Sequence, residues 1–225
     1  MKNNLKQRYR LKKMKVIIKM PRNKIKKFII YLLNYIIVFI AKLVGNIFYD
    51  SKYLKGKYFP KNKYSLGWDW VLKSCLLQKI VGFNRAVPFP VSPMATVVNY
   101  KNIEFDIENI NIFQKPGNYY QAKDAKIVIG RGCFIACNVG IITTNHDPYD
   151  LNNYNKGKDV IIGENCWIGL NSVILPGTVL GPNTIVGAGS IVTKSFEEGY
   201  CIIAGNPAKL IKKLRKSDCI DMREE

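Results

Sequence analysis

The sequence predicts a mainly β protein built on a parallel β-helix, with a helical extension before it and a short helix after it. Two observations support this fold class. An aliphatic residue recurs at every sixth position from Ile162 onward, and glycine follows it in most of these hexads. Fixed hexads are the signature of a parallel β-helix, in which each hexad supplies one short strand and one corner. We therefore expect the first residue of each hexad to fill the interior.

Residues 1–85 are predicted to form a basic, partly helical extension. No Asp or Glu occurs before Asp50, and the chain opens with a dense run of Lys and Arg. The apolar run after Lys27 has about 14 residues, whereas a membrane-spanning helix needs about 20. We expect this run either to lie at a membrane surface, with the basic residues against anionic headgroups, or to pack on the rest of the chain. No small-residue cleavage site follows it, so a signal peptide is disfavoured.

Residues 86–225 are predicted to form the β-helix domain. Every hexad from residue 162 to residue 197 begins with an aliphatic residue. An earlier block that starts at residue 129 keeps the same spacing. The fifth residue is small in the five hexads from residue 162 to residue 191, so we expect it to fit inside beside the aliphatic residue. Glycine at the second position is expected to provide the backbone geometry of a tight corner. The residues after Pro207 are predicted to form the C-terminal helix.

The chain leaves the hexad pattern in an excursion at residues 147–159. His146, the only histidine, precedes it directly in the stretch TTNHDPYD, and counting from Ile141 places His146 at the sixth position of a hexad, at a corner. Imidazole has an unperturbed pKa near neutrality, so general acid–base chemistry at neutral pH would use this residue. The alternative is that the polar residues around it only form a turn. We expect the excursion to be a lid or an acceptor-binding loop.

The composition limits the partners of the chain. The formal net charge of +19 attracts anions such as phosphorylated cofactors, acidic glycans and lipid headgroups. No recognised nucleic-acid module accompanies this charge, so we expect no nucleic-acid partner. Six cysteines without a C-x-x-C pair, and a single histidine, predict no metal site.

The sequence resembles the hexapeptide-repeat acyltransferases. The resemblance rests on the hexads, the NHD turn and the stretches CWIGLNSVILPGTVLG, IVGAGSIVTKS and AGNPAKLIKKL, and it extends over roughly residues 127–214. The family includes maltose, galactoside and serine acetyltransferases and many surface-polysaccharide O-acetyltransferases. The resemblance implies a left-handed β-helix, a homotrimer and acetyl-CoA bound in the groove between neighbouring β-helices.

The resemblance also implies roles for individual residues. The histidine that matches His146 is a general base, which removes the proton of the acceptor as the acceptor attacks the thioester. Gln121, in NYYQA, stands where galactoside and maltose enzymes have an acceptor-binding asparagine. Trp167 matches an aromatic residue near the acceptor, and its alternative role is to pack against the loop. Coenzyme A would run past a set of positions that match Leu170, Ala188, Thr193, Lys194 and Lys209.

The function predicted from these residues is acetyl-CoA-dependent O-acetylation of a sugar or glycan precursor. The expected location is the cytoplasm, at the inner face of the membrane. Two alternatives stay open: a xenobiotic O-acetyltransferase, and a β-helical scaffold that binds a polyanion or membrane without chemistry. The β-helical carbonic anhydrases are set aside because they need three histidines.

Overall fold

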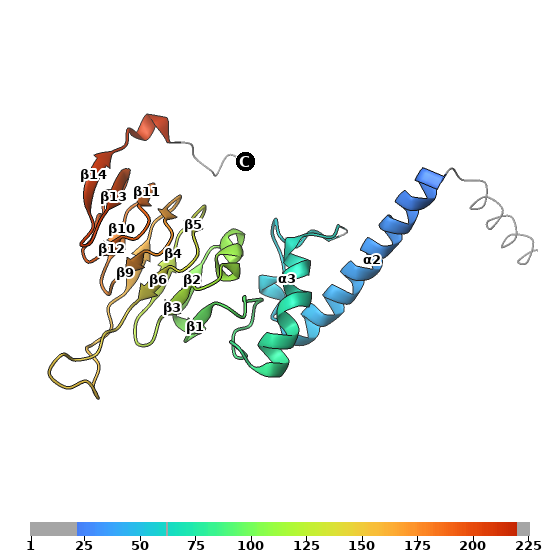
Figure 1. The fold of residues 1–225 in the computed structure, drawn as a ribbon, viewed down its shortest axis with the longest axis horizontal. Helices are drawn as coiled ribbons and strands as arrows, with labels where there is room; N and C mark the ends of the chain where they lie inside the picture. The colour runs from blue at the N-terminus through green and yellow to red at the C-terminus, as the bar shows by residue number, and fades with distance from the viewer. Residues whose placement is uncertain (1–21, 62, 220–225) are drawn as a thin grey trace, which may run out of the picture.

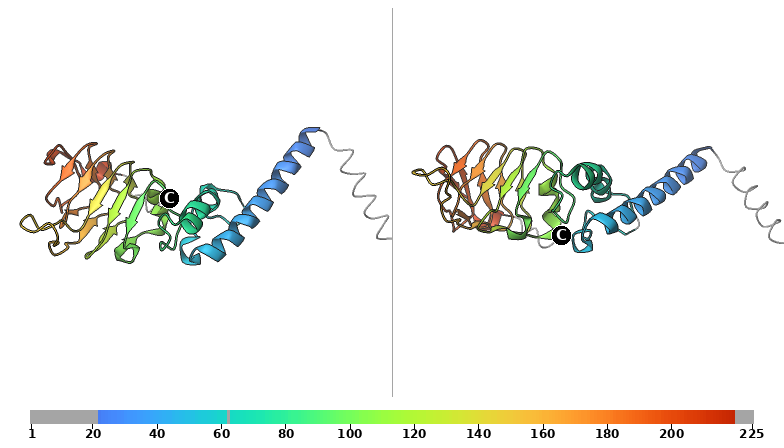
Figure 2. Two further views of the ribbon diagram at one scale, coloured as in Figure 1. Left: turned by 60° about the horizontal axis from the view of Figure 1, so that its bottom comes forward. Right: turned by 90° about the horizontal axis from the view of Figure 1, so that it is seen from below.

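The computed structural model describes residues 22–61 and 63–219. Figure 1 shows a long helix, a small helical layer and a stack of short strands, which follow one another from the N-terminal to the C-terminal part of the chain. The strand stack is a prism whose coils are seen from two further directions in Figure 2. The predicted class, a mainly β fold with a parallel β-helix and a helical extension, is confirmed.

Three sheets form the faces of the prism, and the chain visits them in turn; all their strand pairs are parallel except β13 with β14. One full coil takes three hexads, because Trp167 pairs with Ile185, eighteen residues later. Ile127 pairs with Val160, thirty-three residues later, so the excursion adds fifteen residues to one coil. The first sheet contains β1 (Thr96–Val98), β3 (Tyr119–Gln121), β6 (Gly140–Ile142), β9 (Val173–Ile174) and β12 (Ile191–Val192).

The other two sheets are built in the same way. The second contains β2 (Ile103–Phe105), β4 (Ile127–Ile129), β7 (Val160–Ile162) and β10 (Val179–Leu180). The third contains β5 (Phe134–Ile135), β8 (Trp167–Ile168), β11 (Thr184–Val186), β13 (Cys201–Ala204) and β14 (Lys209–Lys213).

The interior of the prism is filled by stacked aliphatic residues. On the first sheet, Ile141, Ile174 and Val192 lie in one register column, and all three are buried. Stacking equal positions of successive strands about 4.8 Å apart turns the hexad period into continuous apolar columns. The small fifth residues are buried beside them, as predicted: Cys166, Ser172, Thr178, Thr184 and Ser190.

The backbone geometry at the corners of the β-helix differs from the prediction in one respect. Glycine at the second position of a hexad does not have the positive φ expected of a tight corner; the positive φ values occur at the fourth position, at Asn165, Asn171 and Asn183, for example. The second-position glycines serve close stacking instead. A Cβ on Gly163 would lie 2.8 Å from the carbonyl carbon of Gly181 in the next coil, closer than real Cβ contacts allow. Asparagine tolerates the left-handed region, which explains its recurrence at the corners.

The N-terminal helical part joins the first coil through one buried amide. It contains α2 (Arg22–Phe48), η1 (Ser51–Tyr53), α3 (Leu66–Cys75) and η2 (Leu76–Val81). Gln78, which is fully buried, donates to the carbonyl of Phe89 and accepts from the amide of Val91 and the hydroxyl of Tyr49. This network ties α2 and the end of α3–η2 to the segment that enters the β-helix.

Aromatic rings close the open end of the prism. Phe113 lies on η4 (Ile107–Gln114), which follows the short η3 (Tyr100–Asn102) and β2. Its ring centroid lies 4.8 Å from those of Phe89 and Phe105 and 4.9 Å from that of Tyr120. A coil end would otherwise expose its apolar interior and unpaired strand edges to water. The aromatic cluster therefore caps the β-helix on the side of the helical part.

The predicted C-terminal helix is wrong. Residues 209–213 form β14, antiparallel to β13, and the only helical turn after it is the three-residue η5 (Lys216–Asp218) within the part of the chain that the structure describes. Gly205 has φ +104 in the turn that reverses the chain. The edge of β13 presents backbone N–H and C=O groups that need partners, and β14 supplies them.

Candidate functional site

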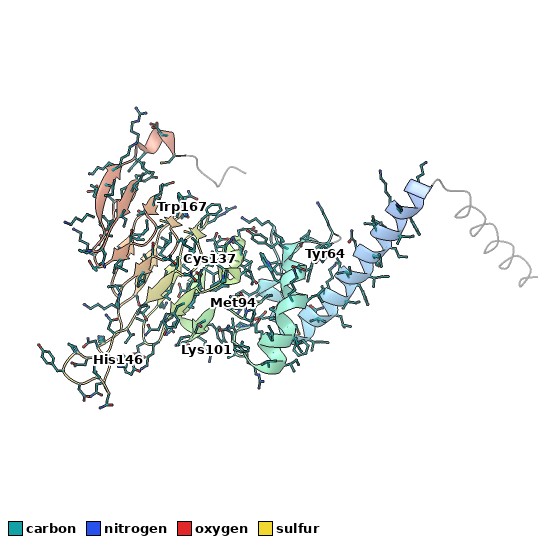
Figure 3. All side chains as sticks on the ribbon, viewed as in Figure 1. Tyr64, Met94, Lys101, Cys137, His146 and Trp167 are labelled. Atoms are coloured by element: carbon teal, nitrogen blue, oxygen red, sulfur yellow. The ribbon has the colours of Figure 1, made fainter. Side chains whose placement is uncertain are left out.

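One edge of the prism carries three of the eight predicted site residues: His146, Thr193 and Lys194. We call it the excursion edge, and it consists of the corners that follow the first sheet: residues 122–126, 143–159, 175–178 and 193–195. The excursion projects from this edge as the long loop at the lower left of Figure 1. Residue 146 lies where the loop departs, and Figure 3 labels it at the base of the projection.

The excursion is an ordered hairpin and not an open loop. Its two limbs pair through an antiparallel bridge between His146 and Tyr154, and the amide of Asn155 donates to the carbonyl of Asn145 at 2.9 Å. The carboxylate of Asp150 accepts from the amide of Asn152 at 3.0 Å and from the side chain of Asn153 at 2.6 Å. Carboxylate side chains that cap their own turn in this way fix its backbone without help from a core.

His146 is held by a backbone carbonyl. Its Nδ1 lies 2.7 Å from the carbonyl oxygen of Leu151 at the hairpin tip. A carbonyl oxygen only accepts, so Nδ1 carries the proton and, in the neutral ring, Nε2 keeps a free lone pair. The residue as a whole is exposed to solvent. The carboxylate of the adjacent Asp147 accepts from the amide of Tyr149 instead.

An aromatic ring supports the imidazole on one face. The ring centroids of His146 and Tyr154 are 4.2 Å apart, with 36° between the ring planes. Lys123 places its Nζ 2.9 Å from the Tyr154 centroid. A cation over the face of a tyrosine ring is attracted by the negative charge density of that face. The excursion is thereby fastened to residues 122–126, which belong to the preceding coil.

Gln121 lies at the end of β3 and is fully engaged with the backbone that leads to His146. Its Nε2 donates to the carbonyl of Thr144 at 3.0 Å, and its Oε1 accepts from the amides of Thr143 and Thr144 at 3.1 and 3.2 Å. These bonds leave the amide little capacity for a ligand in this arrangement. Gln121 therefore holds the segment that leads to the imidazole.

An open groove runs along the excursion edge. It passes between the returning limb of the excursion and the corners of two later coils, and its lining is Asn145, Asn155, Lys156, Lys158, Leu175, Pro176 and Thr193. Of the predicted cofactor residues, Thr193 lines it and Lys194 follows directly. The two lining lysines are exposed. A groove with two cations and a neutral wall suits the phosphates and the pantetheine arm of coenzyme A.

The remaining predicted residues lie elsewhere on the chain. Trp167 is on the outer face of the third sheet, 54% exposed, beside Phe134 in the same register column. Figure 3 shows Trp167 and His146 at opposite sides of the prism. Leu170 and Ala188 are exposed at the corners between the third and first sheets, and Lys209 is on β14. The structure therefore does not bring these residues to His146 within one chain.

The comparisons with known proteins agree with the repeat architecture. Residues 159–194 match the family model described as the hexapeptide repeat of succinyl-transferase. A Dictyostelium discoideum protein named for acetyltransferase activity is 50% identical over 91 residues, which cover 39% of this chain and 47% of that protein. Residues 159–194 of the β-helix are thus similar to hexapeptide repeats. The first three matches among named proteins carry acetyltransferase names, and the chain spans 47%, 49% and 64% of their lengths.

Two further proteins are similar to part of this chain. The polysialic acid O-acetyltransferase of Escherichia coli O1:K1 is 45% identical over 91 residues, which cover 39% of this chain and 29% of that protein. A galactoside acetyltransferase solved in complex with coenzyme A matches with a TM-score of 0.40 and 28% identity, over 56% of this chain and 64% of that chain.

Sequence reasoning missed several parts of the site. The partner of His146 is the main-chain oxygen of Leu151, to which no side-chain motif could point. Tyr154 and the two groove lysines, Lys156 and Lys158, were inside the predicted excursion, but only the hairpin pairing brings them beside His146 and the groove. Among the described residues, no group of three or more His, Cys, Asp or Glu side chains could hold a metal ion.

Proposed function

We propose that this hexapeptide-repeat domain transfers an acetyl group from acetyl-CoA to a hydroxyl of a sugar or glycan precursor, with His146 as the general base. The observation that supports this most directly is the bond from Nδ1 of His146 to the carbonyl of Leu151. It fixes the tautomer in which Nε2 can accept a proton. An exposed histidine that only formed a turn would not need this orientation.

The chemistry requires one proton transfer in each direction. The acceptor hydroxyl attacks the thioester carbonyl carbon while Nε2 of His146 takes its proton, which gives a tetrahedral intermediate. The C–S bond then breaks, and the imidazolium returns the proton to the departing coenzyme A thiolate. Positioned general-base catalysis of this kind typically contributes about 10² to 10⁴ in rate.

Acetyl-CoA is proposed to lie in the groove of the excursion edge. Lys156 and Lys158 would contact its phosphates, and Thr193 and Lys194 would lie beside the pantetheine arm. The sugar-type acceptor is supported by the relatives named for action on polysialic acid, which is a glycan. The acceptor would approach Nε2 of His146.

We propose a homotrimer as the active form. The predicted cofactor residues fall on two different edges of one prism: Thr193 and Lys194 with His146, and Leu170 and Ala188 on the other edge. A neighbouring copy could bring the second edge against the first. The exposed aromatic pair of Phe134 and Trp167 offers apolar area for such a contact. Analytical ultracentrifugation of the full chain tests this: a monomeric enzyme that is fully active would refute it.

The test of the function is acetyl transfer from acetyl-CoA, followed as thiol release. We expect activity with a sugar or oligosaccharide acceptor, a loss of about 10² to 10⁴ in kcat for His146→Ala, and unchanged coenzyme A affinity. Chloramphenicol serves as the xenobiotic acceptor. If it is the better acceptor, the glycan assignment is wrong. Wild-type chain that neither binds coenzyme A nor releases thiol would favour a scaffold without chemistry.

A further inference from the structure

Helix α2 carries an apolar stripe that faces solvent along most of its length. The stripe consists of eight large aliphatic and aromatic residues at spacings of three and four, and each of them is between 44% and 64% exposed: Ile29, Leu32, Leu33, Ile36, Phe39, Ile40, Leu43 and Ile47. Residues at these spacings share one face of a helix. No charged residue interrupts this face. Contiguous exposed apolar surface of this extent marks an interaction site.

The opposite face of α2 has a different character in each half. In the C-terminal half, Val38, Ala41 and Gly45 are buried where α2 packs on α3. The same face continues through Asn34 and Lys27, four and eleven residues before Val38, and these two residues are polar and exposed. The C-terminal half of α2 therefore has a protein-bound face on one side and the stripe on the other, whereas the N-terminal half also exposes Phe28, Ile30 and Tyr31 outside the stripe.

The length of α2 alone would permit a membrane span. Lys26–Phe48 has 23 residues and is apolar enough to cross a bilayer by length and composition, which corresponds to about 35 Å of helix. A span would place the packed half of α2, together with α3, in hydrocarbon. α3 carries the Asp69–Lys73 ion pair at 2.7 Å, and the Lys73 side chain is 76% exposed. Exposed charges of this kind are costly in a bilayer core.

We propose that α2 lies in the plane of an anionic lipid bilayer, with the apolar stripe in the acyl region and the polar face toward water. In this orientation α3 and its ion pair stay on the aqueous side. Lys24, Lys26 and Lys27 lie at the start of the helix and are exposed, and no acidic residue precedes Asp50 in the sequence. Cations beside an apolar stripe bind to anionic headgroups. The proposal does not depend on the transferase activity.

Charge complementarity identifies the occupant as a lipid surface and not a second helix. A protein groove that covered α2 would have to meet two requirements. It would have to match the shape of a stripe that continues for five turns, and it would have to accommodate the three lysines beside that stripe. An anionic bilayer meets both requirements with no specific shape.

The experiment is co-sedimentation of the full chain with phosphatidylcholine vesicles that contain or lack phosphatidylglycerol. We expect binding that is at least about 10-fold stronger with the anionic lipid and that weakens with salt. The double variant Phe39→Ser, Leu43→Ser should weaken binding about 30-fold or more. The matched control is Leu66→Ser, Leu76→Ser, which removes two similarly exposed apolar side chains from α3 and η2, outside the stripe, and should change binding less than about 3-fold.

Several outcomes would overturn the proposal. Equal losses in the two double variants would mean that the stripe is not the contact. Equal binding to neutral and anionic vesicles would show that the lysines do not contribute to binding. The triple variant Lys24→Gln, Lys26→Gln, Lys27→Gln tests their contribution separately. Resistance of the bound chain to alkaline carbonate extraction would mean that α2 spans the bilayer. Circular dichroism of each variant confirms that the loss is not caused by unfolding.

Discussion

The Nδ1 atom of His146 lies 2.7 Å from the carbonyl oxygen of Leu151, five residues further along the same hairpin. The loop that leaves the β-helix thus returns to orient the side chain at its own base. The orienting group is neutral, so it fixes the tautomer without adding a full negative charge beside the imidazole. The orientation of His146 therefore depends on the contacts that hold Leu151 in place.

The first prediction concerns Asp150, whose carboxylate fixes the turn next to Leu151. Asp150→Ala should lower kcat about 10-fold, because the carbonyl of Leu151 would no longer be held at hydrogen-bond distance from Nδ1. The KM for acetyl-CoA should not change.

Its control lies in the same turn. Asn152 contributes its backbone amide to Asp150, so Asn152→Ala keeps the bonds to the carboxylate and should leave kcat as in the wild type. Asp150→Asn keeps an acceptor oxygen and should recover most of the rate. Equal kcat values for wild type and Asp150→Ala would show that the turn does not act through His146.

The second prediction separates two roles for Gln121. As a positioning residue, it holds the backbone of Thr143 and Thr144. Gln121→Ala should therefore lower kcat about 10-fold, with little change in the KM for the acceptor, and should cost about 1 to 3 kcal/mol in unfolding free energy because buried backbone groups lose their partners. If Gln121 bound the acceptor, as its match to the family asparagine implies, the KM would rise instead.

A second glutamine provides the comparison. Gln114 donates from its side chain to the carbonyl of Pro90, outside the excursion edge. Gln114→Ala should reduce stability by a similar amount without changing kcat. Equal kinetic effects in both variants would indicate that Gln121 acts only through general stability.

The third prediction concerns the ring that supports the imidazole. Tyr154→Ala removes the stacking partner of His146 and the aromatic face below Lys123. We expect faster amide hydrogen exchange in residues 146–155 and a several-fold lower kcat. Tyr154→Phe keeps the ring and should behave as the wild type in both measurements. Unchanged exchange in the alanine variant would mean that the hairpin bonds alone order the loop.

The fold was predictable because it depends on a period. Residues such as Ile162, Ile168 and Ile174 recur at a spacing that only stacked coils convert into buried columns, and all three are buried. The C-terminal strand β14 was not predictable in the same way. AGNPAKLIKKL has no hexad, and its conformation is decided by the free edge of β13, which exists only in three dimensions.

The site could be predicted only where the type of a side chain indicates its chemistry. His146 could be named because it is the sole imidazole, and its place at the start of the excursion followed from the hexad count. Its partner could not be named, because a main-chain oxygen of Leu151 has no signature in the sequence. The separation of Trp167 from His146 could not be foreseen either, since a period assigns residues to sheets but not to the same edge of the prism.

The fourth prediction tests the groove. Lys158 lines it and is exposed, so its contact with a coenzyme A phosphate should be worth about 1 kcal/mol. Lys158→Ala should raise the KM for acetyl-CoA about 5-fold with unchanged kcat, and the difference should shrink at high salt. Lys209→Ala is the comparison, because Lys209 lies on β14 and not in this groove. A larger effect from Lys209 would place the phosphates there.

The last prediction distinguishes the two kinds of corner position. Gly163 is a second-position residue, and a Cβ there would lie 2.8 Å from the backbone of the next coil, so Gly163→Asn should lower the free energy of unfolding by about 2 to 3 kcal/mol. Gly189 is a fourth-position residue with φ +71 and nothing within 4 Å of an added Cβ. Asparagine already has this conformation at equivalent positions, so Gly189→Asn should change stability by less than about 1 kcal/mol. Denaturant unfolding measures both, and equal losses would refute the separate roles of stacking and corner geometry.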